Sequence, residues 1–483
     1  MTSMERIPCN DPAALQAVVR RLEDGLLERD TAARLMLLAA VAAEHVLLIG
    51  PPGTAKSELA RRLHAEIAPS CDGLGPACFE RLLTRFSTPE ELFGPLSLKA
   101  LEDDRYERLV DGYLPTAQVA FLDEVFKANS AILNALLSLL NERVFDNGTQ
   151  RLRVPLVSVV AASNETPADE ALHAFFDRFL IRIPVQPVSD GAFEQLLSAQ
   201  PVAPDNEPAA TPLGEAERHA MAMAADAVDL APDTLVALRT LRQFLRTQAG
   251  AHPGPGVSDR RWRQLARLLC VAAAAEGRRS VEPEDLWLVA YVVPADIAQV
   301  PAILRWWQDT VLEIGAADSP GWQRSTEAFE KQLEIESRAQ AEEGAEAAGK
   351  MALARSVGGT DNPGASGEML RLYSARLEER LRKRWSPLHI RARAAQVREV
   401  RLTVQAALAQ TRQAFNAWTA RLCNRLWLPP SLAEQSLEPL RLRIALLSDL
   451  SHRLQAAEAG FAALPVDESL ADVPAPISLT HPV

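Results

Sequence analysis

The feature that most constrains the fold is an apolar run at residues 46–49 (VLLI), followed directly by GPPGTAKS at 50–57. The run predicts a buried strand and residues 57–67 predict a helix, which is the strand–loop–helix context of a phosphate-binding loop. Gly50 and Gly53 allow the backbone to curl so that its N–H groups point at phosphate oxygens. The start of the helix adds a positive dipole end. We expect Lys56 to reach the β- and γ-phosphates and Ser57 to hold Mg²⁺.

One position departs from the usual loop pattern. The sixth residue of GxxxxGK[ST] is Ala55 rather than glycine. Alanine is the smallest residue with a Cβ, so we expect it to fit if the local φ is negative. The predicted nucleotide-binding residues of the loop are Gly50, Pro51, Pro52, Gly53, Thr54, Ala55, Lys56 and Ser57.

A second string, VAFLDE at 119–124, supplies carboxylates. Residues 119–122 are apolar without alternation, which is typical of a buried parallel strand. Asp123 is predicted to hold Mg²⁺, directly or through water, and Glu124 to polarise the attacking water. An Asp-Glu pair alone is weak evidence, but behind a phosphate loop at this spacing it indicates nucleoside triphosphate hydrolysis.

The rest of residues 1–200 alternates between strand and helix patterns. Strands are predicted at 46–49, 79–85, 119–122, 156–162 and 181–185, and helices at 12–43, 129–145 and 168–180. Asn147-Gly148 predicts a hairpin between 144–145 and 152–154, and 87–115 predicts a loop–hairpin insertion. The alternation predicts an α/β core whose parallel sheet is covered by helices.

Beyond this core the pattern becomes helical. Residues 201–214 are predicted to be a linker and 215–310 an all-helical lid. Residues 311–464 predict a helical arm with a flexible segment near 342–367, and the Pro-rich residues 465–483 predict a disordered tail. Helices at 369–384 and 395–460 are expected, with a break at Pro429-Pro430.

Composition limits the partners and the compartment. The 483-residue chain has a net charge of −12, which argues against broad nucleic-acid binding. No apolar run approaches the ~20 residues of a membrane span, and no secretory leader is visible. The five cysteines are scattered along the chain. We therefore expect a cytoplasmic protein with reduced thiols. Residues 371–401 are rich in arginine; a solvated helix face pairing with acidic residues at 327–346 is favoured over a nucleic-acid or membrane patch.

Three further polar residues are placed to complete a hydrolytic site shared between subunits. Asn164 ends a predicted strand, which would put it beside Glu124 to orient water. Arg178 follows a helix and is a candidate for a finger that acts on a neighbouring subunit, and Arg260 begins a helix of the lid and is a candidate to fold over the γ-phosphate. Asn164 as a turn residue and Arg178 as half of a surface ion pair are the alternatives. Arg261 is equally basic, so the choice between it and Arg260 stays open.

Several strings in order resemble one family. The strings are GPPGTAKS, RFSTPEELFGPLS, FLDEVFKA, AILNALLSLLNER, AASNE, DRFLIR and VSDRRW. Over residues 11–310 the chain resembles the MoxR branch of the AAA+ ATPases, and more narrowly the RavA (regulatory ATPase variant A) group. The resemblance is weaker at 395–460, where a helical pair with an LWLPPS break is similar to the arm of that group.

The resemblance implies a hexameric ring of AAA+ modules, each an α/β P-loop core with a helical lid, that hydrolyses ATP with Mg²⁺. It implies that Asn164 is the first sensor, Arg178 the finger and Arg260 the second sensor, and that the 87–115 insertion faces the central pore. It also implies chaperone-like remodelling of a protein partner, with a von Willebrand factor A-domain protein as an associate.

Residues 342–370 depart from the RavA pattern. They lack the β alternation of the module that docks lysine decarboxylase, which argues against that partnership. An alternative is a nucleotide-binding switch or scaffold that does not turn over ATP. Such a protein would be expected to have replaced Glu124, Asn164 or Arg178, and none of these is replaced. A nucleic-acid motor needs a basic pore, whereas 87–115 is acidic on balance.

Overall fold

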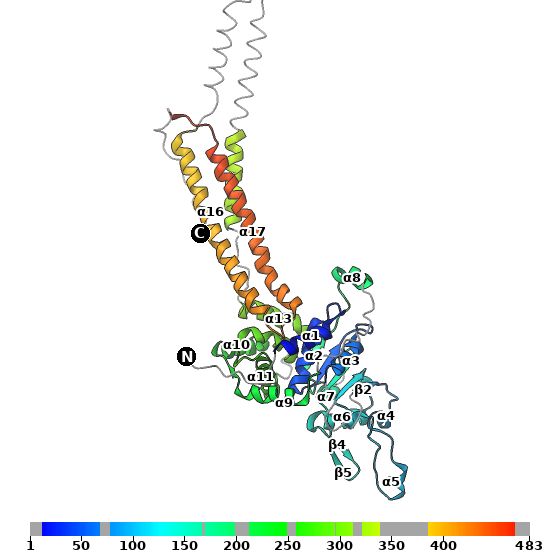
Figure 1. The fold of residues 1–483 in the computed structure, drawn as a ribbon. Coiled ribbons are helices and arrows are strands. Elements are labelled where there is room, and N and C mark those ends of the chain that lie inside the picture. The colour runs from blue at the N-terminus through cyan, green and yellow to red at the C-terminus, as the bar shows by residue number, and fades with distance from the viewer. Residues whose placement is uncertain are drawn as a thin grey trace, which may run out of the picture. The chain divides into compact units, whose positions relative to one another are not determined.

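The computed structural model describes residues 12–67, 78–166, 170–198, 212–248, 257–294, 296–312, 321–338 and 385–468. The chain divides into two compact units, 1–315 with 419–436 and 316–418 with 437–483. The first unit holds the sheet and the lid, and the second holds most of the long helices (Figure 1). Each is described by itself.

A five-stranded parallel sheet organises the first unit, in the order β2-β3-β6-β1-β7. The strands are β1 (Val46–Ile49), β2 (Cys78–Leu82), β3 (Val119–Asp123), β6 (Ser158–Ser163) and β7 (Ile181–Pro184). Their apolar runs are buried because both faces of a parallel sheet are covered by helices. All five strand predictions are confirmed.

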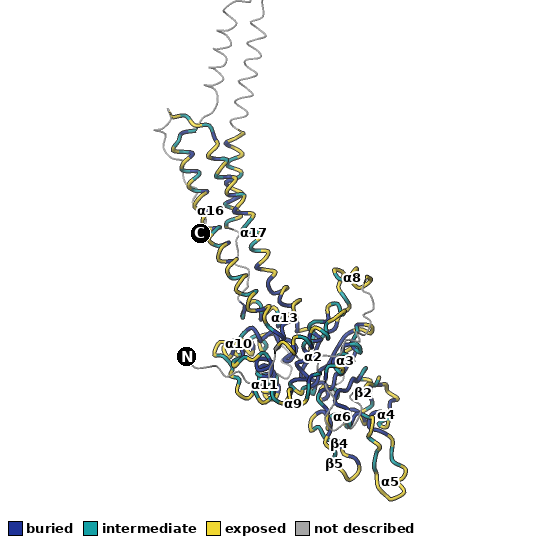
Figure 2. The backbone as a smooth tube through the Cα atoms, in the orientation of Figure 1, coloured by how far each residue is buried: buried dark blue, intermediate teal, exposed yellow. Residues whose placement is uncertain are grey.

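Helices cover both faces of this sheet. The helices of the core are α1 (Pro12–Glu23), α2 (Asp30–Ala42), α3 (Lys56–Ala65), α6 (Ser130–Glu142), α7 (Glu170–Phe176) and α8 (Phe193–Ser198). Short turns of tighter helix are η1 (Leu114–Thr116), η2 (Val125–Lys127) and η3 (Asp190–Ala192). Leu47, Leu122 and Ala161 pack with α6 and α7 in one hydrophobic cluster, whereas α2 and α3 lie against the sheet elsewhere. The buried stretch of α2 stands out in Figure 2.

Two elements project from the core. The predicted hairpin is β4 (Val144–Asn147) paired antiparallel with β5 (Gln150–Arg153). The 87–115 insertion is not a pair of strands: it contains two short helices, α4 (Pro89–Phe93) and α5 (Leu98–Glu102), and one antiparallel bridge between Leu96 and Arg108. Thr88 and Ser97 cap these helices, which explains why the segment becomes helical despite its turns.

The lid is mostly helical. Its elements are α9 (Glu215–Ala224), η4 (Ala225–Ala227), α10 (Pro232–Gln248), α11 (Asp259–Ala275), η5 (Pro283–Leu288), α12 (Val289–Val292), η6 (Ile297–Gln299), α13 (Val300–Trp306) and η7 (Trp307–Val311). The prediction of helices only is wrong at one place, where β8 (Asp229–Leu230) pairs in parallel with β9 (Ser280–Val281). Strands of two residues are too short to show a period in the sequence.

The second unit is built on helices, namely residues 321–338 and parts of α16 (Pro387–Leu422) and α17 (Pro430–Ala462). Arg393 lies 3.9 Å from Glu336 of the predicted acidic partner stretch, but Arg398 and Arg401 pair instead with Glu458, both at 2.8 Å. Of the predicted linker, only residues 212–214 are described. The predicted flexible segment near 342–367 and the predicted helix at 369–384 lie outside the described residues.

Residues 465–468, the first of the predicted disordered tail, belong to the described part of the chain, and 465–467 contact Trp385. Pro465 O accepts a hydrogen bond from Trp385 N at 2.9 Å, and Val466 forms a bridge with Trp385. Residues 469–483 lie outside the described residues. Among the described helices, none combines the length and the apolar character that crossing a membrane requires.

Candidate functional site

The loop at 50–55 joins β1 to α3 and has two tight constraints. A Cβ on Gly50 would lie 1.9 Å from Val185 O, so only glycine fits there. Gly53 has φ +81°. Ala55 has φ 65°, so the negative φ under which alanine was expected to fit is not found. Ala55 is the residue just before α3, and it adopts the left-handed conformation where the backbone passes from loop to helix.

Lys56 is buried at the first position of α3. Its Nζ donates to Gly50 O at 2.7 Å and to Pro51 O at 2.8 Å, so the ammonium lies over the loop. Burial lowers the pKa of Lys56, and the nearby carboxylates of Asp123 and Glu124 oppose that shift. A lysine beside the loop and two carboxylates near it are the groups that a magnesium-bound triphosphate requires, the cation for the phosphates and a carboxylate for the metal.

The carboxylates lie at the end of β3. Asp123 Oδ1 accepts a hydrogen bond from Glu124 N at 3.0 Å, and Glu124 adopts a left-handed φ of 53°. Glu124 pairs with Lys127 at 3.3 Å and accepts a hydrogen bond from Asn164 Nδ2. The structure therefore brings Asn164 beside Glu124, at the edge where β1, β3 and β6 all end. A left-handed conformation at a polar residue is a feature that clusters at functional sites.

Arg29 is a residue of this region that the sequence did not reveal. Its side chain is buried and donates from Nε to Thr54 O at 3.1 Å and from Nη2 to Gln186 O at 2.8 Å. It thus ties the phosphate loop to the segment after β7. A hollow of about 160 Å³ lies here, with Thr31 and Tyr291 among the other residues that line it. No local pattern marks Arg29, because its partners lie 25 and 157 residues away.

Arg178 and Arg260 lie at the other edge of the sheet. Arg178 lies three residues before β7, whose first residue, Ile181, pairs with Val46 at the start of β1. Burial lowers the pKa of Arg178, and the neighbouring charge of Arg260 lowers it further. The Nε of Arg178 makes no hydrogen bond within the described part of the chain.

Arg260 also interacts with Glu44, which precedes β1. Parallel strands place their starts at one edge and their ends at the other, so Arg260 lies at the edge opposite Lys56. Arg260 therefore lies away from the phosphate loop of its own chain, and its predicted place over a γ-phosphate stays a prediction.

Arg261 differs from its neighbour. It is only 4% exposed. Its guanidinium donates to Asp177 Oδ1 at 2.8 Å, to Leu180 O at 2.9 Å and to Val292 O. These bonds hold the start of α11 against the segment that leads into β7. Arg260 is exposed, whereas the guanidinium of Arg261 is already hydrogen-bonded within the chain, which favours Arg260 as the residue that could contact a nucleotide.

A parallel sheet with a phosphate loop, paired carboxylates and a helical lid defines a P-loop nucleoside triphosphatase of the AAA+ class. Residues 13–217 match the family model of the MoxR domain in the MoxR-vWA-beta-propeller ternary systems, and residues 233–306 match that of an AAA lid domain. The chain belongs to the MoxR family of AAA+ ATPases, with an α/β core, a helical lid and a C-terminal helical arm.

The chain is also similar to individual proteins. Uncharacterized protein MJ0079 of Methanocaldococcus jannaschii is 39% identical over 287 residues, which cover 59% of this chain and 71% of that protein. Uncharacterized protein MJ0812 of the same organism is 37% identical over 281 residues, covering 58% and 70%. A protein of known structure from Cytophaga hutchinsonii is more distant, at 17% identity and a TM-score of 0.48, covering 61% of this chain and 94% of its own.

Proposed function

We propose that this chain is a ring motor, which hydrolyses ATP at sites shared by neighbouring copies and uses the cycle to remodel a protein partner. The observation that carries the proposal is the division of the catalytic groups. The phosphate loop and carboxylates lie at one edge of the sheet, and Arg178 and Arg260 lie at the other. One copy therefore presents a nucleotide, and the next copy presents cations to it, which repeats around a closed ring such as a hexamer.

The loop edge supplies binding and water activation. Backbone N–H groups of 50–55 and the Lys56 ammonium would hold the phosphates, and Ser57 and Asp123 would hold Mg²⁺. Bound Mg²⁺ would neutralise charge on the phosphate oxygens. Glu124 would accept a proton from the attacking water, and its hydrogen bond from Asn164 would orient the carboxylate.

Arg178 and Arg260 of the adjacent copy would stabilise the charge that develops on the transferred phosphoryl group. The purine would occupy the hollow next to Arg29, because Arg29 bonds to loop residue Thr54 and so places the hollow beside the phosphates. The preference for ATP over other nucleotides follows from the family.

The client surface is proposed to be the insertion. Apolar side chains there face solvent, including Leu98 at 76%, Leu109 at 56% and Tyr106 at 54% exposure. Exposed apolar groups on projecting segments mark sites for protein contact. A von Willebrand factor A-domain protein is the proposed associate, supported by the description of the matching MoxR family model. The RavA-like subgroup, the absence of a decarboxylase partner and the cytoplasmic location stay predictions.

Mixing two inactive variants tests the shared site. Arg178→Ala is expected to bind nucleotide and not turn it over, and Lys56→Ala is expected not to bind. In an equal mixture, about a quarter of the interfaces would combine an intact loop with an intact arginine, so turnover should return. Arg151→Ala, an exposed arginine of the hairpin, is the matched control and should turn over normally. Turnover that stays absent in mixed rings of confirmed mass would refute the shared site.

A further inference from the structure

The turn between α16 and α17, residues 423–429, joins two long helices, and its second half, 426–429, is buried. Leu426, Trp427 and Leu428 are 7%, 2% and 3% exposed. These residues belong to the first unit, together with the core and the lid. We call residues 423–431 the arm tip.

The arm tip is bonded to the end of α11 in the lid. Trp427 donates from its indole Nε1 to Ala272 O at 3.0 Å. Glu276, which follows the last residue of α11, accepts hydrogen bonds from Leu426 N at 2.8 Å and from Trp427 N at 3.3 Å. The arm tip therefore satisfies groups at the carboxyl end of the helix that begins near Arg260.

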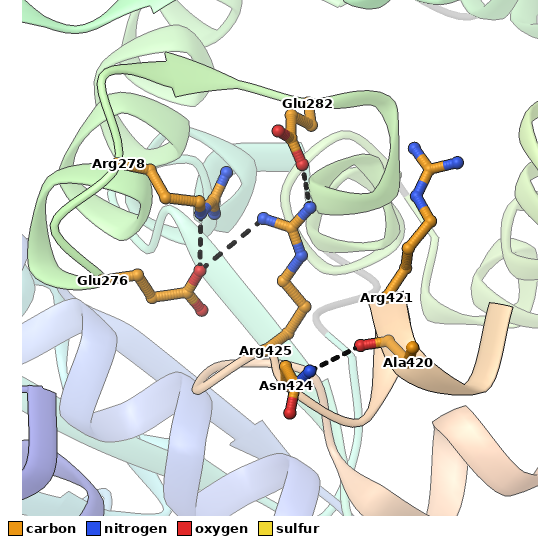
Figure 3. Close-up of a pocket in the computed structure, with 7 residues that line it drawn as sticks. All are labelled: Glu276, Arg278, Glu282, Ala420, Arg421, Asn424 and Arg425. Atoms are coloured by element: carbon orange, nitrogen blue, oxygen red, sulfur yellow. Dashed lines mark hydrogen bonds and ion pairs between the residues drawn. The ribbon is translucent and has the colours of Figure 1, made fainter. Parts of the chain in front are cut away.

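Charge reinforces this contact. Figure 3 shows Arg425 reaching between Glu276 and Glu282, beside a hollow of about 390 Å³. Arg425 also lies 3.6 Å from Asp285, and Arg278 bonds to both Asp285 oxygens at 2.7 and 2.8 Å. Arg425 thus places one positive charge of the arm tip among three carboxylates of the lid, those of Glu276, Glu282 and Asp285.

The arm tip is also bonded to the core. Arg34 of α2 donates to Leu426 O and to Leu428 O, and Asp30 Oδ2 accepts a hydrogen bond from Ser431 N at 3.1 Å. Asp30 is the first residue of α2, directly after Arg29, whose guanidinium donates to loop residue Thr54. Two hydrogen bonds and the covalent link between Arg29 and Asp30 thus connect the arm tip to the phosphate loop.

We propose that the arm tip is a positioning element of the nucleotide cycle, which couples occupancy of the phosphate loop to the placement of α11 and Arg260. The inference rests on the proposed function. α11 has 17 residues and is about 25 Å long, so a rotation at its Glu276 end moves Arg260 at the other. Because the arm tip bonds α2 and α11 together, a change at either helix reaches the other through it.

The alternative is that the arm tip only adds stability. The two differ in their effect on nucleotide affinity, since coupling is reciprocal: if nucleotide binding alters the arm tip, then weakening the arm tip alters nucleotide binding by the same factor. A purely structural contact lowers the Tm and leaves the affinity unchanged.

The affinity of Mg·ATP is measured in Glu124→Gln protein, which prevents hydrolysis. Trp427→Phe keeps an aromatic ring and removes the Nε1 donor to Ala272, and Arg425→Ala removes the central charge. Each is expected to shift the Kd about fivefold or more. Arg453→Ala is the matched control, since it breaks a bidentate pair with Glu330 in the second unit, at 2.8 and 2.6 Å, and should shift the Kd less than about twofold.

Hydrogen exchange gives the reciprocal readout. Addition of Mg·ATP should change exchange in peptides that span 423–431 in Glu124→Gln protein and leave it unchanged in Lys56→Ala protein. Two results would overturn this inference and leave the proposed function standing. One is a set of arm-tip variants with a lower Tm and an unaltered Kd for Mg·ATP. The other is slower hydrogen exchange at 50–57 on addition of Mg·ATP without any change at 423–431. Failure of Glu124→Gln protein to bind Mg·ATP would overturn the proposed function, and the inference with it.

Discussion

Substitution of two adjacent arginines should separate stability from turnover. Arg261→Ala is expected to destabilise the first unit, whereas Arg260→Ala is expected to leave its stability unchanged and to slow hydrolysis. The two residues carry the same charge and are adjacent in the first turn of α11, but Arg260 is exposed and Arg261 is buried and hydrogen-bonded.

The magnitude follows from the bonds of Arg261. Its guanidinium donates to Asp177 Oδ1, Leu180 O, Phe179 O and Val292 O. At about 1 kcal/mol net for each hydrogen bond, their loss costs about 4 kcal/mol. Burial, followed by repulsion from Arg261, lowers the pKa of Arg182 to about 9, so removal of Arg261 relieves some repulsion. A net loss of about 3 kcal/mol remains, which corresponds to about 5 °C in Tm.

Arg260 has no such role. It is exposed, so Arg260→Ala should change the free energy of unfolding by less than about 0.5 kcal/mol. Loss of a cation that faces a developing charge should lower kcat about 100-fold. Calorimetry and ATPase rates on both variants, at protein concentrations where rings form, make the comparison. A stable Arg261→Ala protein, or an Arg260→Ala protein with normal kcat, would refute the assignment.

Three further outcomes are expected. Ala55→Gly removes the strain of a left-handed alanine, which stabilises the folded state by about 1–2 kcal/mol. Glycine also raises the entropy of the unfolded chain, which costs up to ~1 kcal/mol. Calorimetry should therefore show a slight rise in Tm, and nucleotide affinity should be retained. Gly50→Ala places a Cβ 1.9 Å from Val185 O and should weaken Mg·ATP binding more than about tenfold in a titration. Asn147→Ala loses bonds to Arg108 N and O, at 2.7 and 3.0 Å, and should cost about 2 kcal/mol and speed proteolysis within 94–113.

The elements that the sequence predicted well are those that contiguous residues determine. The strand at 46–49, its loop and the carboxylates after 119–122 form local strings with one plausible geometry, and Asn164 follows from the end of the next strand in the sheet. The hairpin at Asn147-Gly148 is confirmed for the same reason, since turn chemistry is local.

The features that the sequence did not predict depend on distant residues or on backbone angles. The φ of Ala55 is imposed by the path from loop to helix, and Arg29 reaches partners that no spacing connects to it. The placement of Arg260 beside Arg178 depends on how the lid packs on the start of β7, which a helical pattern cannot reveal. The arm tip was visible only as a Pro-Pro break, because its bonds to α2 and α11 span more than a hundred residues.

The central claim is that hydrolysis requires a neighbouring copy, and it is tested most directly by ATPase rate against protein concentration, with mass measured by light scattering at each point. The account predicts that the rate per subunit rises together with a ring-sized mass in the wild type and is absent in Glu124→Gln protein. A constant rate per subunit from a monomer would contradict it, because one copy does not place Arg178 and Arg260 at its own phosphate loop.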